Sequence, residues 1–283
     1  MRLLLLLLCM LLPFRSHGDE LKKIAITLDD VPMESGRVFK GLDRTKRIIQ
    51  TLKDSDVKVG LFVIGINLTR NNGERRLEMY DEAGHMISNH TYSHPACRKT
   101  DDKNFIANIK KCHEMISSYK HFKPFFRFPY LDECKQFSKK NKNVENTLNE
   151  LGYEKAFVTI VTIDWYFNSL LQKALCNGKN VNYDNLKELY LQMVLEAVKK
   201  HDKSLISLIG YRPVHNLLFH ENDITALYLG DVIEMLRDNG WTIVDPEEAF
   251  ADQDLSNRTQ KISYNANSII PYYKKLFYIK VIE

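Results

Sequence analysis

The sequence lacks a strong excess of charge of either sign. Its 40 basic and 36 acidic residues give a formal net charge of +4 over 283 residues. Two of the basic residues, Arg2 and Arg15, belong to the N-terminal leader-like segment, so the rest of the chain is closer to neutral. A protein that binds nucleic acid usually carries a marked basic excess or a basic patch. We therefore expect no nucleic-acid partner.

Cysteines are few, and no two of them form a Cys-x-x-Cys pair. A zinc site built from thiolates is therefore not expected. Cys9 lies in the N-terminal segment, which leaves four cysteines for the folded chain: Cys97, Cys112, Cys134 and Cys176. Four cysteines allow three pairings, and the sequence leaves one or two disulfides and four buried thiols equally open.

Apolar runs long enough to span a bilayer as a helix, about 20 residues, are also absent. The run at residues 3–12 is shorter, follows a basic residue and precedes the small residues Ser16 and Gly18. This arrangement is typical of a cleaved secretory signal peptide, here residues 1–18. We expect a mature start near Asp19 and export to the periplasm, the cell envelope or the exterior. An uncleaved membrane anchor is the alternative.

No linker rich in proline, glycine or serine divides residues 19–250, so this part is predicted to be one domain. Within it, short strand-like apolar runs alternate with segments of helical period. The runs are residues 24–28, 59–64, 125–128, 156–163, 216–219 and 242–244, and the helical segments include residues 44–52, 105–119 and 186–198. The alternation predicts an α/β fold with a parallel sheet covered by helices, either a barrel or an open doubly wound sheet.

Residues 251–283 form a separate C-terminal tail in this interpretation. Its last part is rich in apolar and aromatic residues with lysines interleaved. We expect the tail to pack back on the barrel, and a contact of the tail with a membrane surface or a partner protein is the alternative.

A pair of carboxylates closes the first predicted strand. Asp29 and Asp30 follow the apolar run at residues 24–28 directly. In parallel α/β folds the reactive groups gather beyond the carboxyl ends of the strands, whereas an ordinary surface turn usually contains Gly, Asn or Ser. One carboxylate can complete a metal site while the other acts as a general base. We therefore interpret the pair as functional.

Two histidines, His90 and His94, stand four positions apart within residues 90–95. If this segment turns helical, both imidazoles lie on one face. Together with a carboxylate they can hold one divalent transition metal, most often zinc. The spacing alone arises often by chance, but the carboxylates at the end of the first predicted strand favour a metal site.

Three further polar residues stand at the ends of predicted strands. Arg127 lies in an aromatic strand, where a buried charge requires a partner. Asp164 and its neighbour Trp165 follow another apolar run, and an ordinary helix cap is the alternative for Asp164. His220 ends a later run, where a packed core histidine is the alternative.

The order of these residues along the chain resembles the five motifs of the polysaccharide deacetylases, the NodB-homology group or carbohydrate esterase family four. The motifs correspond to residues 27–30, 90–95, 127–130, 164–165 and 218–220. The similarity spans residues 21–250, and no charged motif position departs from the family pattern; Leu28 replaces the commoner phenylalanine. The resemblance implies a distorted (β/α)-barrel of seven strands.

The resemblance also implies a metal centre and an acid–base pair. Asp30, His90 and His94 would bind one divalent transition metal, most often zinc. Asp29 would be the general base that deprotonates the attacking water. His220 would be the general acid that protonates the departing amine.

Five other residues would support this chemistry by the same resemblance. Arg127 would hold the base ionised, and Asp164 would support the protonated form of the acid. The backbone N–H of Tyr130 would stabilise the developing oxyanion. Trp165 and Leu218 would shape the pocket that receives the acetyl methyl group.

The implied reaction is the hydrolytic removal of the N-acetyl group from an N-acetylglucosamine-containing polysaccharide, with release of acetate and a free amino sugar. Peptidoglycan, chitin and poly-N-acetylglucosamine all offer this group, and the sequence does not distinguish them. A metallopeptidase is disfavoured because no glutamate lies between His90 and His94 to act as its base. A non-catalytic carbohydrate-binding protein on the same scaffold is disfavoured because binding alone requires neither Asp29 nor His220.

Overall fold

The computed structural model describes residues 21–134, 138–252, 255 and 268–282. The predicted signal peptide, residues 1–18, lies outside these residues and stays a prediction. None of the helices in the described ranges is long and apolar enough to cross a membrane.

In the described part of the chain, the core is a sheet of eight strands whose pairings are all parallel. Seven strands follow one another in the order β5-β4-β3-β2-β1-β7-β6, and β8 pairs with the first residues of β1. The strands are β1 (Lys22–Val31), β2 (Gly60–Val63), β3 (Met86–Asn89), β4 (Phe122–Phe126), β5 (Glu154–Lys155), β6 (Ile160–Val161), β7 (His215–His220) and β8 (Trp241–Ile243). The predicted parallel sheet is confirmed.

The two ends of this series meet on one segment of chain, residues 154–161. Its first residues pair with β4 and its last residues pair with β7. Between them, the N–H of Ala156 donates to the carbonyl of Phe126 at 2.9 Å, and the N–H of Thr159 donates to the carbonyl of Asn216 at 3.2 Å. The sheet therefore curls into a distorted barrel, which confirms the fold expected from the resemblance. Of the run predicted at residues 156–163, only β6 forms a strand, and β5 lies just before the run.

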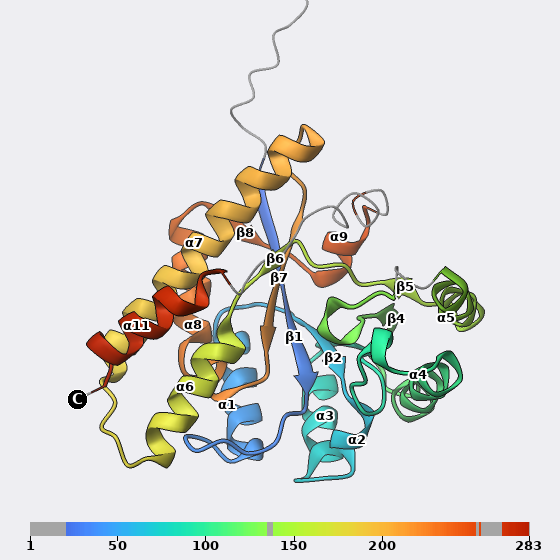
Figure 1. Ribbon diagram of the computed structural model, residues 1–283, viewed down its shortest axis with the longest axis horizontal. Coiled ribbons are helices and arrows are strands. Elements are labelled where there is room, and N and C mark those ends of the chain that lie inside the picture. Colours follow the sequence, from blue (N-terminus) through green and yellow to red (C-terminus); the bar gives the residue numbers. More distant parts are fainter. Residues whose placement is uncertain (1–20, 135–137, 253–254, 256–267, 283) are drawn as a thin grey trace, which may run out of the picture.

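Helices surround the strands (Figure 1). They are α1 (Gly41–Asp54), α2 (Gly65–Leu68), α3 (Gly73–Glu82), α4 (Asp102–Ile116), α5 (Ser138–Glu150), α6 (Asp164–Cys176), α7 (Tyr183–Ile209), α8 (Asp223–Asp238), α9 (Pro246–Phe250) and α11 (Ile270–Lys280). Helix α4 illustrates how they form. Its buried residues Phe105, Ile109, Cys112 and Ile116 recur at helical spacing, and Asp101 caps its N-terminus by accepting from the N–H of Asn104 at 2.9 Å.

The apolar runs in the sequence predict neither β5 nor β3, and β3 is a central strand of the sheet. Only two of its four residues are apolar, and the other two, Ser88 and Asn89, are buried. Asn89 is satisfied there because its amide donates to the carbonyl of Ile109 at 3.0 Å and to the hydroxyl of Tyr153 at 2.9 Å. Tertiary partners thus permit a central strand where no apolar run exists.

The C-terminal helix α11 lies against α7 (Figure 1). Tyr273 and Phe277 form its buried face, and the Tyr273 hydroxyl donates to a carboxylate oxygen of Glu196 on α7 at 2.6 Å. The N–H of Asn182, which precedes α7, donates to the carbonyl of Val281 at 2.8 Å. The boundary between domain and tail at residue 250 stays a prediction.

Candidate functional site

A cavity of about 430 Å³ opens at the carboxyl ends of β1, β3 and β7. Its lining residues come from five separate stretches of the chain: Asp29, Asp30, Met33, His90, His94, Tyr130, Leu131, Val161, Thr162, Trp165, Asn168, Leu218, His220 and Asn222. All ten residues predicted from the sequence line this cavity except Arg127 and Asp164. These two lie behind residues that do.

Asp30, His90 and His94 form one group of metal-ligand type. Oδ1 of Asp30 lies 3.5 Å from Nε2 of His90 and 3.3 Å from Nε2 of His94, and one ligand atom of each residue lies within 4.8 Å of the others. Oδ1 of Asp30 is buried and finds no hydrogen-bond partner within the described residues. Because a buried carboxylate oxygen without a donor is costly, this atom fits a cation.

The tautomer of His90 also suits metal binding. Nδ1 of His90 lies 2.7 Å from the carbonyl of Arg127, to which it donates. Nε2 of His90 therefore carries the lone pair and faces Asp30. The residues present fit a divalent cation held by two imidazoles and one carboxylate.

Electrostatics favour the ligand forms of two of these residues. Burial raises the pKa of Asp30, but the neighbouring imidazoles of His90, His220 and His94 outweigh it and hold this pKa well below its usual range. Burial and the neighbouring His90 lower the pKa of His94 to about 4. Metal binding requires an ionised carboxylate and a neutral imidazole, and both are the forms present at neutral pH.

The segment that carries the two histidines is not helical, so the condition for stacking of positions i and i+4 along a helix is not met. His90 follows β3 directly, and residues 91–96 form an irregular loop. Thr91 and His94 adopt left-handed backbone conformations with φ of 70° and 56°, and the N–H of His94 donates to the Thr91 hydroxyl at 3.0 Å. This turn brings the two rings to a centroid distance of 4.8 Å. Such backbone conformations cost about 1–3 kcal/mol and cluster at functional sites.

Asp29 and Arg127 form a buried ion pair beside the metal-ligand group. Oδ1 of Asp29 lies 3.0 Å from Nη1 of Arg127. Arg127 is fixed by a hydrogen bond from its Nε to the carbonyl of Ala156 at 2.7 Å, and its guanidinium lies over the ring of Phe62 at 4.1 Å. The other carboxylate oxygen, Oδ2, lies 3.9 Å from Nε2 of His90. Asp29 is thus neutralised on one side and borders the cavity on the other.

Asp164 and His220 form the second buried pair. Oδ1 of Asp164 lies 3.0 Å from Nδ1 of His220, and Oδ2 accepts from the backbone N–H of His220 and from the amide of Asn222, both at 2.8 Å. Burial alone would lower the pKa of His220, but the charge and hydrogen bond of Asp164 outweigh it and raise this pKa to about 10. His220 is therefore protonated at neutral pH. The sequence does not single out Asn222, because an asparagine before a helix predicts an N-cap. Asn222 is indeed the N-cap of α8.

Two aromatic residues flank the mouth of the cavity. Tyr130 is 67% exposed and Trp165 is 44% exposed, whereas Leu218 is buried. Tyr130 has a left-handed backbone with φ of 59°, and its ring lies 4.5 Å from the ring of His94. Met33 also lines the cavity and was not predicted, because it lies in a loop without a motif.

A disulfide joins Cys97 to Cys134, while Cys112 is a buried free thiol and Cys176 an exposed one. Of the alternatives that the sequence keeps open, the structure therefore selects a single disulfide and two free thiols. It ties the loop that follows His94 to the loop that follows Tyr130, two segments that border the cavity.

Removing this disulfide is expected to destabilise the protein. Its two cysteines are 37 positions apart, and closing a loop of that size stabilises by about 2–4 kcal/mol. The double variant Cys97→Ser/Cys134→Ser should lower the free energy of unfolding by that amount in urea titrations. Cys176→Ser, which removes an exposed free thiol, is the control and should change it by less than about 0.5 kcal/mol. Equal stabilities of the two variants would contradict the expectation.

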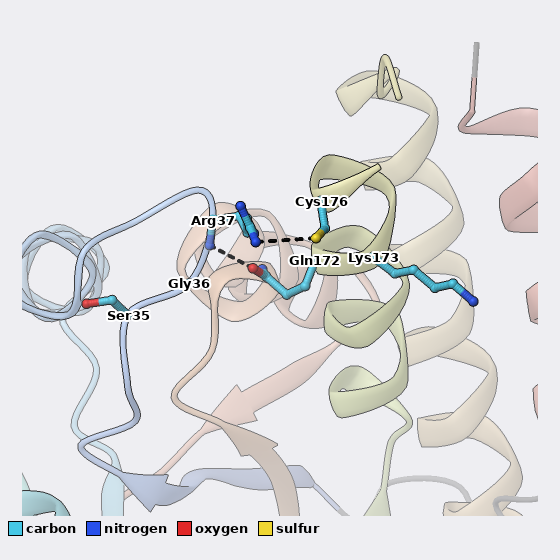
Figure 2. A pocket seen from close by; sticks show the side chains of 6 residues that line it. All are labelled: Ser35, Gly36, Arg37, Gln172, Lys173 and Cys176. Carbon is cyan, nitrogen blue, oxygen red and sulfur yellow. Dashed lines mark hydrogen bonds between the residues drawn. The ribbon is translucent and has the colours of Figure 1, made fainter. Parts of the chain in front are cut away.

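A second pocket lies between the loop that follows β1 and helix α6 (Figure 2). It is lined by Ser35, Gly36, Arg37, Gln172, Lys173 and Cys176. The N–H of Arg37 donates to the side-chain oxygen of Gln172 at 2.7 Å, and Nη2 of Arg37 donates to Sγ of Cys176 at 3.3 Å (Figure 2). These contacts attach the loop to α6.

Comparison with known sequences gives one family and several relatives. A family model described as "Polysaccharide deacetylase" matches residues 17–156. A peptidoglycan-N-acetylglucosamine deacetylase of Bacillus cereus is 33% identical over 110 residues, which are 38% of this chain and 36% of the relative. A chitin deacetylase of Colletotrichum lindemuthianum is 25% identical over 149 residues, which are 51% of this chain and 54% of the relative. The chain thus spans about a third to a half of the length of these relatives.

Solved structures share the fold. A carbohydrate esterase family four pseudoenzyme from Bacillus anthracis has a TM-score of 0.59 at 18% identity, covering 82% of this chain and 66% of the other. A family four carbohydrate esterase from Streptomyces lividans in complex with acetate has a TM-score of 0.54 at 15% identity, covering 81% of this chain and 95% of the other. At these identities the similarity concerns the fold alone.

Proposed function

This chain belongs to the polysaccharide deacetylase family, and we propose that it hydrolyses the N-acetyl group of an N-acetylglucosamine-containing polysaccharide. The products would be acetate and a free amino sugar. One observation carries the proposal: a carboxylate, a group of metal-ligand type and a protonated imidazole border the same cavity. Relatives named as peptidoglycan and chitin deacetylases support this substrate class.

The residues that would hold the metal are Asp30, His90 and His94. Two imidazoles and one carboxylate are a ligand set that zinc commonly occupies. A bound divalent cation supplies Lewis-acid polarisation of the acetyl carbonyl and makes a water molecule in the site more acidic.

Asp29 would accept the proton of the attacking water. It borders the cavity and is excluded from the metal-ligand group by its ion pair with Arg127. The guanidinium compensates the buried negative charge, since an unpaired carboxylate would be costly there. Arg127 would in this way keep the base ionised and correctly oriented.

His220 would donate a proton to the departing amine. It is protonated at neutral pH because Asp164 raises its pKa to about 10. The hydrogen bond between Nδ1 and Asp164 leaves Nε2 as the nitrogen available to a substrate. Departure of the amine without a proton would be slow, so this transfer is expected to contribute about 10²–10⁴-fold to the rate.

The remaining groups would orient the substrate. The backbone N–H of Tyr130 would donate to the developing oxyanion. Leu218 is buried against the cavity and Trp165 lies at its mouth, so they would surround the acetyl methyl group. Export directed by residues 1–18 would bring the protein to a cell-wall or extracellular glycan.

Acetate release tests the proposal. The purified protein should release acetate from acetylated chito-oligosaccharides or cell-wall glycan, a chelator should suppress the release, and added Zn²⁺ should restore it. His94→Ala should lose bound metal in elemental analysis, whereas Glu82→Ala, which changes an exposed carboxylate, should retain it. Glycan binding without acetate release from any of these substrates would favour the non-catalytic carbohydrate-binding function instead.

A further inference from the structure

Four charged side chains lie buried beside the cavity and take no part in the chemistry above. They are Arg44, Arg76, Glu221 and Asp223, none more than 2% exposed. Nη1 of Arg44 pairs with Oδ1 of Asp223 at 2.9 Å, and Nη2 of Arg76 pairs with Oε2 of Glu221 at 2.7 Å. Burying four charges is costly even when they are paired, so their other contacts are informative.

Three of the four hold the backbone of Met33, in the loop between β1 and α1. The N–H of Met33 donates to Oε2 of Glu221 at 2.6 Å. The carbonyl of Met33 accepts from Nη2 of Arg44 and from Nη1 of Arg76, both at 2.7 Å. One residue of a surface loop is therefore fixed by charged groups on both of its peptide units.

The fourth member holds the rest of this loop. Oδ2 of Asp223 accepts from the N–H of Val38 at 3.0 Å and from the side-chain amide of Gln172 on α6 at 2.9 Å. The loop passes so close that a Cβ added at Gly36 would lie 2.0 Å from Oδ2 of Asp223. Gln172 in turn accepts from the N–H of Arg37 (Figure 2).

The cluster also contacts the catalytic strand ends. Glu221 directly follows His220, and its N–H donates to the carbonyl of Asp29 at 3.2 Å. Met33 lines the cavity together with Asp30 and His94. A methionine side chain is flexible and adapts its shape, so its place in the cavity depends on how firmly its backbone is held.

We propose that Met33 contacts the glycan and that the buried cluster of Arg44, Arg76, Glu221 and Asp223 positions it, so that the cluster sets the affinity for the substrate. Met33 is then a substrate-contact residue, and the four charged residues are positioning residues that act through it. This inference rests on the proposed function.

The test uses a charge-conserving variant. Arg76→Lys keeps a positive charge beside Glu221 but lacks the planar fork that reaches Glu221 and the Met33 carbonyl together. We expect KM for a fully acetylated chito-oligosaccharide to rise about 10-fold while kcat stays within about threefold. Arg75→Lys is the matched control, because Arg75 is the neighbour on α3 and pairs with glutamates at the surface; its KM should not change.

A double-mutant cycle separates positioning from general stability. If the cluster acts through Met33, Arg76→Lys should add less than about twofold to KM in a Met33→Ala background. An equally large rise in both backgrounds, or a loss of kcat with KM unchanged, would overturn the proposal. Wild-type KM in Met33→Ala would overturn it as well.

Two further measurements test the proposal if Arg76→Lys does not fold or if the protein releases no acetate. If Arg76→Lys does not fold, Gly36→Ala displaces the loop without altering a charge, and an unchanged KM in that variant would contradict the proposal. If the wild-type protein releases no acetate, the proposed function fails, and calorimetric dissociation constants of the same oligosaccharide for the wild type, Met33→Ala and Gly36→Ala test the positioning separately. Equal constants for the three proteins would then refute it.

Discussion

Asp29→Asn is expected to lower the rate of acetate release by about 10²–10⁴-fold, the usual contribution of a general base. The substitution keeps the size of the side chain but removes the group that accepts the proton. The metal-ligand group does not include Asp29, so the metal content should stay at the wild-type level. Steady-state kinetics and elemental analysis of the same preparation measure both effects.

Asp54→Asn provides the control, because Asp54 is an exposed carboxylate at the end of α1. It should leave both rate and metal content unchanged. Near wild-type activity in Asp29→Asn would show that another group accepts the proton. Loss of metal in that variant would instead place Asp29 among the ligands.

Asp164→Asn is expected to move the alkaline limit of activity to lower pH by about two or more units. His220 must be protonated to act as an acid, and its pKa of about 10 in the folded protein is raised by Asp164. In the wild type the acid is therefore available through neutral pH and is lost as the pH approaches 10. Without the carboxylate, burial dominates and lowers the pKa of His220, so the alkaline limit of activity moves to lower pH.

The pH dependence of kcat/KM measures this shift. At pH 8 a shift of two units should make the variant about twofold slower than the wild type, a larger shift should make it slower still, and its activity should recover at lower pH. The neutral substitution Ser169→Ala, at an exposed position of α6, should not move the limb. An alkaline limb that stays in place in Asp164→Asn would contradict the role of this pair.

The sequence predicted the fold well because the features that decide it are local. Apolar runs of strand length alternate with helical periods, and this alternation alone indicates a parallel sheet covered by helices. Strand β3 could not be predicted, because it contains the polar residues Ser88 and Asn89. Their burial depends on tertiary hydrogen bonds, which no local pattern shows. The closure of the barrel by residues 154–161 could not be predicted either, because it depends on pairing with two distant strands, β4 and β7.

The sequence by itself determined which side chains stand at the strand ends, among them Asp29, Asp30 and His220, because a strand end follows directly from where an apolar run stops. Only the tertiary structure decided how they meet. A left-handed turn, not a helix, brings His94 to His90, and a buried cluster around Glu221 fixes Met33. Backbone conformation in loops and pairing between distant charges depend on the whole fold, and no single stretch of sequence specifies them.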